Sequence, residues 1–215
     1  EGLYKKPTVV NNVETLAAIP CILKFGAKAF SAVGNTKSAG TKLVCLDSLF
    51  KKPGVYEIDM GTSMKKIIHE IGGGFIEPVK ALQVGGPLGG VIPIKEVEKL
   101  NLDFQEFTKA GFMLGHGSIV SIPKTFSMVK YIHHLFKFSS DESCGKCFPG
   151  RLGSYRGKEM FDQAINKTNK IPIKLLNELL VTMQKGSLCA LCGAIPLPIQ
   201  NILKYFTDEF KTDIN

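Results

Sequence analysis

The stretch ESCGKCFPGR, residues 142–151, and the stretch GSLCALC, residues 186–192, each carry two cysteines separated by two residues. Thiolates at this spacing on a tight turn can reach one metal centre, and four of them satisfy either zinc or an iron–sulfur cluster. The predicted metal ligands are Cys144, Cys147, Cys189 and Cys192. The interval from Cys147 to Cys189 exceeds that of common zinc ribbons, which places iron–sulfur slightly ahead of zinc.

Amphipathic segments surround these two cysteine pairs and predict a helical bundle. They are FSMVKYIHHLFKF (126–138), GSYRGKEMFDQAINK (153–167), IKLLNELLVTMQKG (173–186) and PIQNILKYFTDEF (198–210). One cysteine pair falls between the first and second segments and the other between the third and fourth. An antiparallel up-and-down bundle would bring both corners to the same end, so the topology allows one four-thiolate site.

The chain before the bundle has a different pattern. Residues 13–31 have apolar positions at helical spacing interrupted by Pro20, which predicts one kinked helix or two short ones. Residues 41–59 alternate between apolar and polar positions around a Lys-Pro-Gly turn, which indicates a β-hairpin.

A helix and further strands are expected after the hairpin. Thr62 is predicted to cap a helix over residues 64–71, which the following glycines end. Strands are predicted at 79–86 and 117–123. Together with the hairpin these elements indicate a small α+β domain in which a sheet grips a helix.

The composition excludes several classes of protein. The net charge is +8, but the lysines are scattered, tryptophan is absent and there is no arginine-rich run, so nucleic-acid binding is disfavoured. No apolar run approaches the roughly eighteen residues of a membrane helix, so we expect no direct membrane insertion and a cytoplasmic location. Six cysteines are too few for a disulfide scaffold, and Cys21 and Cys45 are expected to be plain core residues because they lie in apolar stretches.

Two other motifs favour structural roles. GGPLGG, residues 85–90, lacks the GxGxxG spacing of a phosphate loop and is predicted to be a tight turn after a strand. His133 and His134 have no third ligand at useful spacing, so packing explains them better than metal binding. No serine–histidine–aspartate order or paired carboxylates indicate a hydrolase.

Four stretches of the sequence match a known family in the family's order. They are KPTVVNNVETL (6–16), the segment from Ser38 to Gly74, GFMLGHGSIVSI (111–122), and ESCGKCFPGR (142–151) together with GSLCAL (186–191). The chain therefore resembles the flavin-carrying, NADH-oxidising subunit of respiratory NADH dehydrogenase, a family shared with NAD-linked hydrogenases and formate dehydrogenases.

This resemblance implies a division into three parts. Residues 1–38 would be the tail of the flavin domain with a connector helix, 39–123 a β-grasp domain of the soluble-ligand-binding (SLBB) type, and 124–215 a four-helix bundle holding a 4Fe-4S cluster. The family's glycine-rich flavin and nicotinamide loop has no counterpart here, so we expect the chain to be about the C-terminal half of the full-length protein. FMN and NAD would then bind only with the missing half, and the fragment alone would not oxidise NADH.

The resemblance also implies a partial flavin site. The family places FMN contacts on the positions matching Val10, Asn11, Asn12 and Thr15. Their amide and hydroxyl groups suit ribityl and phosphate oxygens. The alternative is an Asn-Asn turn before a helix that Glu14 and Thr15 begin, and the same residues are compatible with it.

One position departs from the family's cluster motif, ESCGxCxPCR. Cys144, Cys147 and Cys189 match family ligands, but the third cysteine of the motif is replaced by Gly150. Cys192 is an additional thiol that the family does not place there. We therefore predict that Cys192 takes the place of the missing ligand; the alternatives are a decayed site and an altered sequence.

The implied function is electron transfer. In the family, electrons pass from NADH through FMN to the cluster. From there they pass to other redox subunits of a multi-subunit oxidoreductase, which include ferredoxin-like iron–sulfur proteins. When the complex is respiratory, these subunits lie in its peripheral arm. The positive charges of Lys146 and Arg151 should raise the cluster's potential. The alternative is a non-redox, zinc-stabilised binding or docking module.

Overall fold

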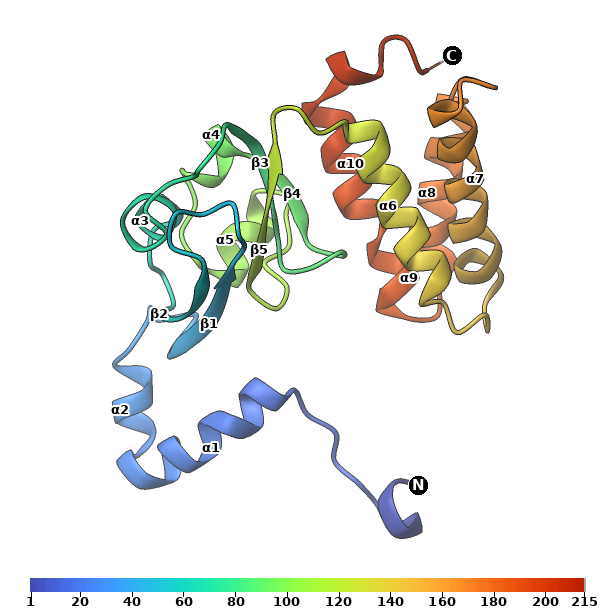
Figure 1. The fold of residues 1–215 in the computed structure, drawn as a ribbon. Helices are drawn as coiled ribbons and strands as arrows, with labels where there is room; N and C mark the ends of the chain where they lie inside the picture. The colour runs from blue at the N-terminus through green and yellow to red at the C-terminus, as the bar shows by residue number, and fades with distance from the viewer. Residues whose placement is uncertain (215) are drawn as a thin grey trace.

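The computed structural model describes residues 1–214 and contains a five-stranded sheet followed by a group of helices (Figure 1). The strand order is β2-β1-β5-β3-β4. β1 (Thr41–Leu46) and β2 (Gly54–Asp59) form the predicted antiparallel hairpin, and β1 runs parallel to β5 (Ser118–Pro123). Residue 215, the last of the predicted helical domain, lies outside the described residues.

The remaining strands form the other edge of the sheet. β3 (Val79–Val84) pairs antiparallel with β5 and with β4 (Gly90–Pro93). The predicted strands at 79–86 and 117–123 are confirmed, whereas β4 was not predicted. GGPLGG forms the tight turn between β3 and β4, where Gly85 and Gly86 have φ angles of +92° and +85° that favour glycine.

The helix that follows the hairpin begins as α3 (Met64–Lys66) and continues as a π-helical turn, η2 (Ile67–Ile71). Its apolar face is buried at Met64, Ile67 and Ile68. The prediction that Thr62 caps this helix is wrong, because Ser63 occupies the N-cap position and its side chain makes no capping bond. Instead, the Thr62 carbonyl accepts a hydrogen bond from the Leu102 N–H, so backbone pairing with a distant segment fixes the start of the helix.

Two short helices of this half were not predicted. They are α4 (Ile94–Val97), directly after β4, and α5 (Phe104–Lys109), before β5. Both are too short to show a helical period in the sequence.

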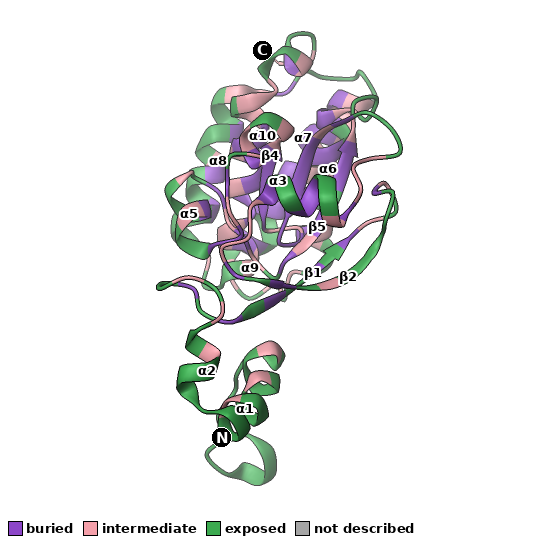
Figure 2. Ribbon diagram, turned by 90° about the vertical axis from the view of Figure 1, so that its left-hand side faces the viewer, coloured by how far each residue is buried: buried purple, intermediate pink, exposed green. Residues whose placement is uncertain are grey.

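The N-terminal segment projects from the rest of the molecule and is largely exposed (Figures 1 and 2). It contains η1 (Leu3–Lys5), α1 (Val13–Phe25) and α2 (Ala27–Ser31). The two short helices are confirmed, but the chain breaks at Gly26, with φ of +86°, while Pro20 lies inside α1.

The prediction that Cys21 and Cys45 are core residues is wrong, since both are exposed. Cys21 lies on α1, which buries none of its residues. Cys45 lies on β1, where burial alternates and where Val44 and Leu46 take the inward positions. An apolar neighbourhood in the sequence does not say which face of an element a residue occupies.

One ion pair ties α1 to the sheet. The Lys42 side chain is 6% exposed, and its Nζ lies 2.7 Å from Glu14 Oε2. The backbone N–H of Leu43 donates to the other carboxylate oxygen at 3.1 Å. Burial opposes ionisation of Glu14, but its partners outweigh burial and lower its pKa.

Replacing Glu14 by alanine is expected to lower the free energy of unfolding by about 1–3 kcal/mol, because the Lys42 charge would remain buried without its partner. Urea denaturation of the two proteins measures this difference. Glu77→Ala is the matched control, because Glu77 is exposed and has no ion pair among residues 1–214. Equal stabilities for the two variants would contradict the role assigned to this pair.

The four predicted amphipathic segments are helical. They are α6 (Met128–Asp141), α7 (Ser154–Ile165), α8 (Ile173–Gly186) and α10 (Pro196–Tyr205). Shorter elements join or follow them, namely η3 (Pro149–Gly153), α9 (Ala190–Ala194) and η4 (Thr207–Phe210). Their shared core includes Phe136, Phe161, Leu176, Leu180 and Ile199.

The sheet packs directly against these helices. Ala81, Val91 and Ile122 belong to the same apolar core as the helices. The Tyr131 hydroxyl of α6 donates to Gln83 Oε1 of β3 at 2.7 Å, and burial raises the pKa of Tyr131. This packed boundary holds the helices in a fixed relation to the sheet. Within residues 1–214, no helix combines the length and apolar composition needed to cross a membrane.

Candidate metal centre

The two cysteine corners meet at one end of the helices, as the segment order predicted. Cys144 and Cys147 lie on the turn between α6 and η3, where Gly145 adopts a φ of +71°. Cys189 occupies the N-cap position of α9, and Cys192 lies within that helix. η3 contacts both α8 and α9, which brings the corners together.

Gly150 marks the point where two of the sulfurs converge. A Cβ built on Gly150 would lie 3.0 Å from Cys147 Sγ and 3.1 Å from Cys192 Sγ. The two sulfurs are therefore no farther apart than the sum of these distances. Cys147 and Cys192 come from corners that are far apart in the sequence, so the tertiary fold creates this approach.

Backbone donors surround the sulfur of Cys147. The N–H groups of Leu188 and Gly150 lower the pKa of this thiol and so favour the thiolate, which is the form that binds metal. The Ser187 hydroxyl acts on the same sulfur, although it lies outside strict hydrogen-bond geometry and has no other partner within the described residues. A donor-rich pocket of this kind stabilises thiolate ligands and their bound groups.

Cys192 has a different environment. Its residue is 2% exposed, and its sulfur lies 3.7 Å from the Oγ of Ser139 on α6. Ser139 and Ser187 were not identified from the sequence. Only their contacts with the cysteines distinguish them from the other serines of the chain.

Cys144 and Cys189 are exposed on the same turns. Within residues 1–214, no three His, Cys, Asp or Glu side chains are placed to hold a single metal ion. A zinc tetrahedron requires sulfurs about 3.8 Å apart, given Zn–S bonds of about 2.3 Å. A four-iron cluster spreads its thiolates over separate irons and tolerates wider spacing. The all-thiolate donor set and the hydrogen-bond donors around the Cys147 sulfur therefore fit an iron–sulfur cluster.

The rim of the cysteine site is apolar and positively charged. Phe148 and Leu188 are 69% and 74% exposed. The Arg151 guanidinium lies over the Phe148 ring at 5.1 Å, and Lys146 is exposed between the first two cysteines. Both cations lie within or next to the first cysteine corner in the sequence.

The predicted flavin contacts lie elsewhere. Val10, Asn11, Asn12 and Thr15 are all exposed on the segment that leads into α1. Asn12 caps this helix, with its Oδ1 accepting the Glu14 N–H at 2.8 Å, and the helix begins at Val13. The structure brings the four residues together along one short segment, and the cap uses one side of the Asn12 amide.

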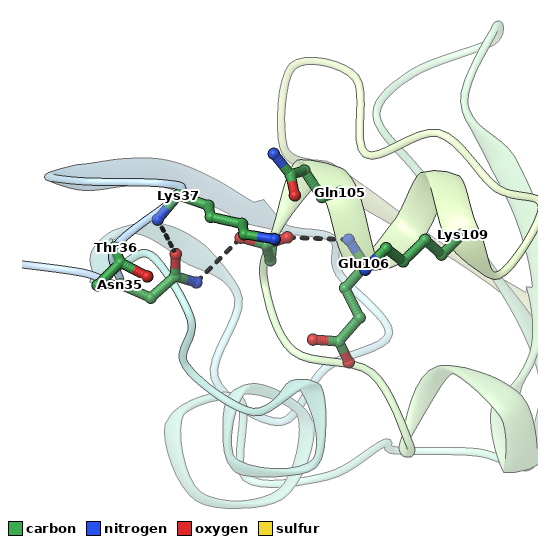
Figure 3. Close-up of a pocket in the computed structure, with 7 residues that line it drawn as sticks. Asn35, Thr36, Lys37, Gln105, Glu106 and Lys109 are labelled. Atoms are coloured by element: carbon green, nitrogen blue, oxygen red, sulfur yellow. Dashed lines mark hydrogen bonds between the residues drawn. The ribbon is translucent and has the colours of Figure 1, made fainter.

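A second candidate is a depression of about 250 Å³ beside α5 (Figure 3). Asp103 is one of its lining residues and accepts from Asn35 Nδ2 at 2.9 Å and from the Glu106 N–H at 2.8 Å. Burial opposes ionisation of Asp103, but its hydrogen-bond donors, Ser38 and Asn35 foremost, outweigh burial and lower its pKa to about 2. Both carboxylate oxygens of Asp103 accept hydrogen bonds that join the 35–38 loop to α5, so we assign this residue a structural role.

Asp103→Asn is expected to destabilise the chain by about 1–2 kcal/mol at neutral pH. Because the folded pKa is depressed, this contribution is present above the unfolded pKa of 3.8 and is lost as the pH falls towards 2. Urea denaturation across this range should show the two proteins converging at the acid end. Asp59→Asn, at an exposed position, is the control, and a difference that is independent of pH would contradict the assignment.

The paired cysteine corners present an all-thiolate donor set of the kind that binds iron–sulfur clusters. Residues 130–213 match the family model described as NADH-ubiquinone oxidoreductase-F iron-sulfur binding region.

The similarity to curated proteins extends over the whole chain. It is 37% identical to an NADH-quinone oxidoreductase F-type subunit of Rhizobium meliloti, covering 99% of this chain and 51% of the relative. It is 34% identical to the HndC subunit of the NADP-reducing hydrogenase of Solidesulfovibrio fructosivorans, covering 100% of this chain and 44% of the relative. The chain thus spans about half the length of the curated relatives it matches.

A solved structure shows the same fold. The NAD⁺-reducing [NiFe]-hydrogenase in its H₂-reduced state superposes with a TM-score of 0.87 at 26% identity, covering 97% of this chain and 36% of that one. The predicted resemblance is therefore confirmed by both sequence and structure.

Proposed function

We propose that this chain is the electron-transfer portion of an NADH-oxidising flavoprotein subunit and that its cysteine corners hold a 4Fe-4S cluster. The observation that carries the proposal is the convergence of the Cys147 and Cys192 sulfurs beside Gly150, within the matched iron–sulfur binding region. The name of that region and the names of the relatives support the same chemistry.

The proposed ligands are Cys144, Cys147, Cys189 and Cys192. When bound, a 4Fe-4S cluster supplies one-electron transfer at a potential that its protein surroundings set. Cys147 is prepared as a thiolate by the Leu188 and Gly150 N–H groups. Lys146 and Arg151 place positive charge nearby, which favours the reduced, more negative state and raises the potential.

The proposed domains keep the boundaries expected from the sequence. Residues 1–38 form the flavin-domain tail and connector, 39–123 the SLBB-type β-grasp domain and 124–215 the four-helix bundle. The strand order, with β1 and β5 parallel at the centre and α3 packed on the sheet, supports the β-grasp assignment. The common core of α6, α7, α8 and α10 supports the bundle.

The proposed flavin contribution is partial. Val10, Asn11, Asn12 and Thr15 present exposed amide and hydroxyl groups for FMN. The rest of the flavin site, and the whole of the NAD site, would be supplied by the remainder of a protein of the length seen in the relatives.

The proposed partners are other redox subunits of a multi-subunit oxidoreductase, including ferredoxin-like iron–sulfur proteins, rather than nucleic acid or a lipid bilayer. The exposed Phe148 and Leu188, with Arg151 and Lys146, give the cysteine site a rim suited to protein contact. We place the chain in the cytoplasm, in the peripheral arm of a complex if that complex is respiratory.

The chain by itself is expected to show no NADH-dependent dye reduction and to bind FMN no tighter than about micromolar, since only one short segment of the flavin site is present. Isothermal titration with FMN and a dye-reduction assay measure these properties. Submicromolar FMN binding or NADH oxidation by this chain alone would contradict the division of the site.

Anaerobic purification with iron and sulfide tests the cluster itself. A 4Fe-4S protein is brown and contains about four irons per chain, whereas a zinc-stabilised docking module is colourless. A colourless protein with stoichiometric zinc and no bound iron would replace the proposed function with the docking alternative.

A further inference from the structure

We propose that positions 150 and 192 supply one cluster ligand between them, so that Cys192 is a ligand only because Gly150 leaves room for it. This inference rests on the proposed function and specifies its fourth ligand. It predicts that glycine and cysteine can be exchanged between the two positions with the ligand set kept at four thiolates.

The first step is that position 150 needs a glycine because a side chain there would be crowded, and not because its backbone conformation excludes other residues. It lies within η3 and does not have a positive φ angle. Residues other than glycine adopt such a backbone without strain. Its N–H acts on the Cys147 sulfur, and its carbonyl accepts from Ser154 Oγ, so its backbone is fully engaged.

The second step is that Cys192 takes up the space that a side chain at position 150 would need. The built Cβ at Gly150 lies 3.1 Å from Cys192 Sγ and 3.3 Å from Cys192 Cβ. Both contacts are closer than ordinary van der Waals separations of about 3.5–4.0 Å. A cysteine at position 150 and a cysteine at position 192 therefore compete for one volume.

The third step is that this shared volume adjoins a metal-binding thiolate. The same built Cβ lies 3.0 Å from the sulfur of Cys147. A thiol at either position thus lies beside the Cys147 sulfur. Burial of Cys192 alone would suit an inert core thiol. Its convergence with Cys147 in the volume that a side chain at position 150 would need points to a ligand.

The test uses four variants of the chain, loaded anaerobically with ferrous iron and sulfide. They are Cys192→Ser, Cys189→Ser, Gly150→Cys alone, and Gly150→Cys with Cys192→Gly. Iron per chain, visible absorption and the EPR signal of the reduced protein are measured. Far-UV circular dichroism and thermal unfolding of the apo-proteins show that each variant is folded.

Cys192→Ser is expected to lower bound iron at least roughly fivefold, because three thiolates leave one iron open to water and labile. The double exchange is expected to restore iron to within about twofold of the unmodified chain. Its EPR signal should shift, since one sulfur approaches from η3 in place of α9. Gly150→Cys alone should not raise iron content, and crowding at this position should lower its unfolding temperature.

The outcomes separate this inference from the proposed function. If Cys192→Ser keeps its iron while Cys189→Ser loses it, the proposed cluster site is supported, but the proposal that positions 150 and 192 share one ligand is wrong. A double exchange as poor in iron as Cys192→Ser also overturns the shared ligand. If Cys189→Ser keeps full iron, the proposed cluster site itself is wrong.

Discussion

Cys147→Ala is expected to lower the iron bound after anaerobic loading from about four atoms per chain to less than about 0.5. The Leu188 and Gly150 N–H groups lower the pKa of Cys147, and its sulfur lies with that of Cys192 beside Gly150. Its removal deletes a ligand and leaves those donors without an acceptor. Metal analysis and visible absorption measure the loss.

Cys21→Ala and Cys45→Ala are the matched controls. Both cysteines are exposed and lie on α1 and β1, outside the two cysteine corners. Each control should bind as much iron as the unmodified chain. If all three variants lose iron equally, the loss of any one cysteine would be enough to explain the effect. The assignment of Cys147 as a cluster ligand would then fail.

Gly157→Ala is expected to reduce the free energy of unfolding by about 2–4 kcal/mol, because it overpacks a closed core. A Cβ at this position of α7 would lie 2.2 Å from Cε1 and 2.3 Å from Cδ1 of Phe136 on α6. The Phe136 ring is fully buried and packs at a tilt against Phe161, so it cannot move aside without displacing the core. Thermal and urea denaturation measure the loss.

Gly193→Ala is the control for helix propensity. Gly193 lies in α9, and the nearest atom to a Cβ there is 3.7 Å away, which is an ordinary contact. An alanine in a helix is favoured over glycine by up to about 1 kcal/mol, so this variant should be no less stable than the unmodified chain. A Gly157→Ala protein as stable as Gly193→Ala would show that α6 and α7 do not approach as closely as described.

Local sequence patterns were sufficient for the principal elements. The hairpin at 41–59 followed from alternation around a Lys-Pro-Gly turn, and both strands were found. The long helices α6 and α8 followed from apolar residues at helical spacing. Such patterns predict structure because they reflect which face of an element is buried, and each needs only a short window of residues.

The errors arose where distant segments decide the outcome. Thr62 has the residue type of a helix cap, yet its carbonyl pairs with Leu102. Cys45 lies in an apolar strand but on its exposed face. The strand β4 was missed because its four residues are too few to show an alternating pattern, and its pairing with β3 depends on the sheet as a whole.

The sequence by itself determined the family resemblance, the four cysteines and the departure at Gly150, because spacing and residue type along the chain carry that information. It also determined that the two corners lie between helices whose order would bring them together. Only the tertiary structure decided that the Cys147 and Cys192 sulfurs both adjoin Gly150 and that Leu188 donates to Cys147. The physical reason is that free volume and hydrogen-bond donors at a point in space come from whichever segments pack there, and no local pattern records that packing.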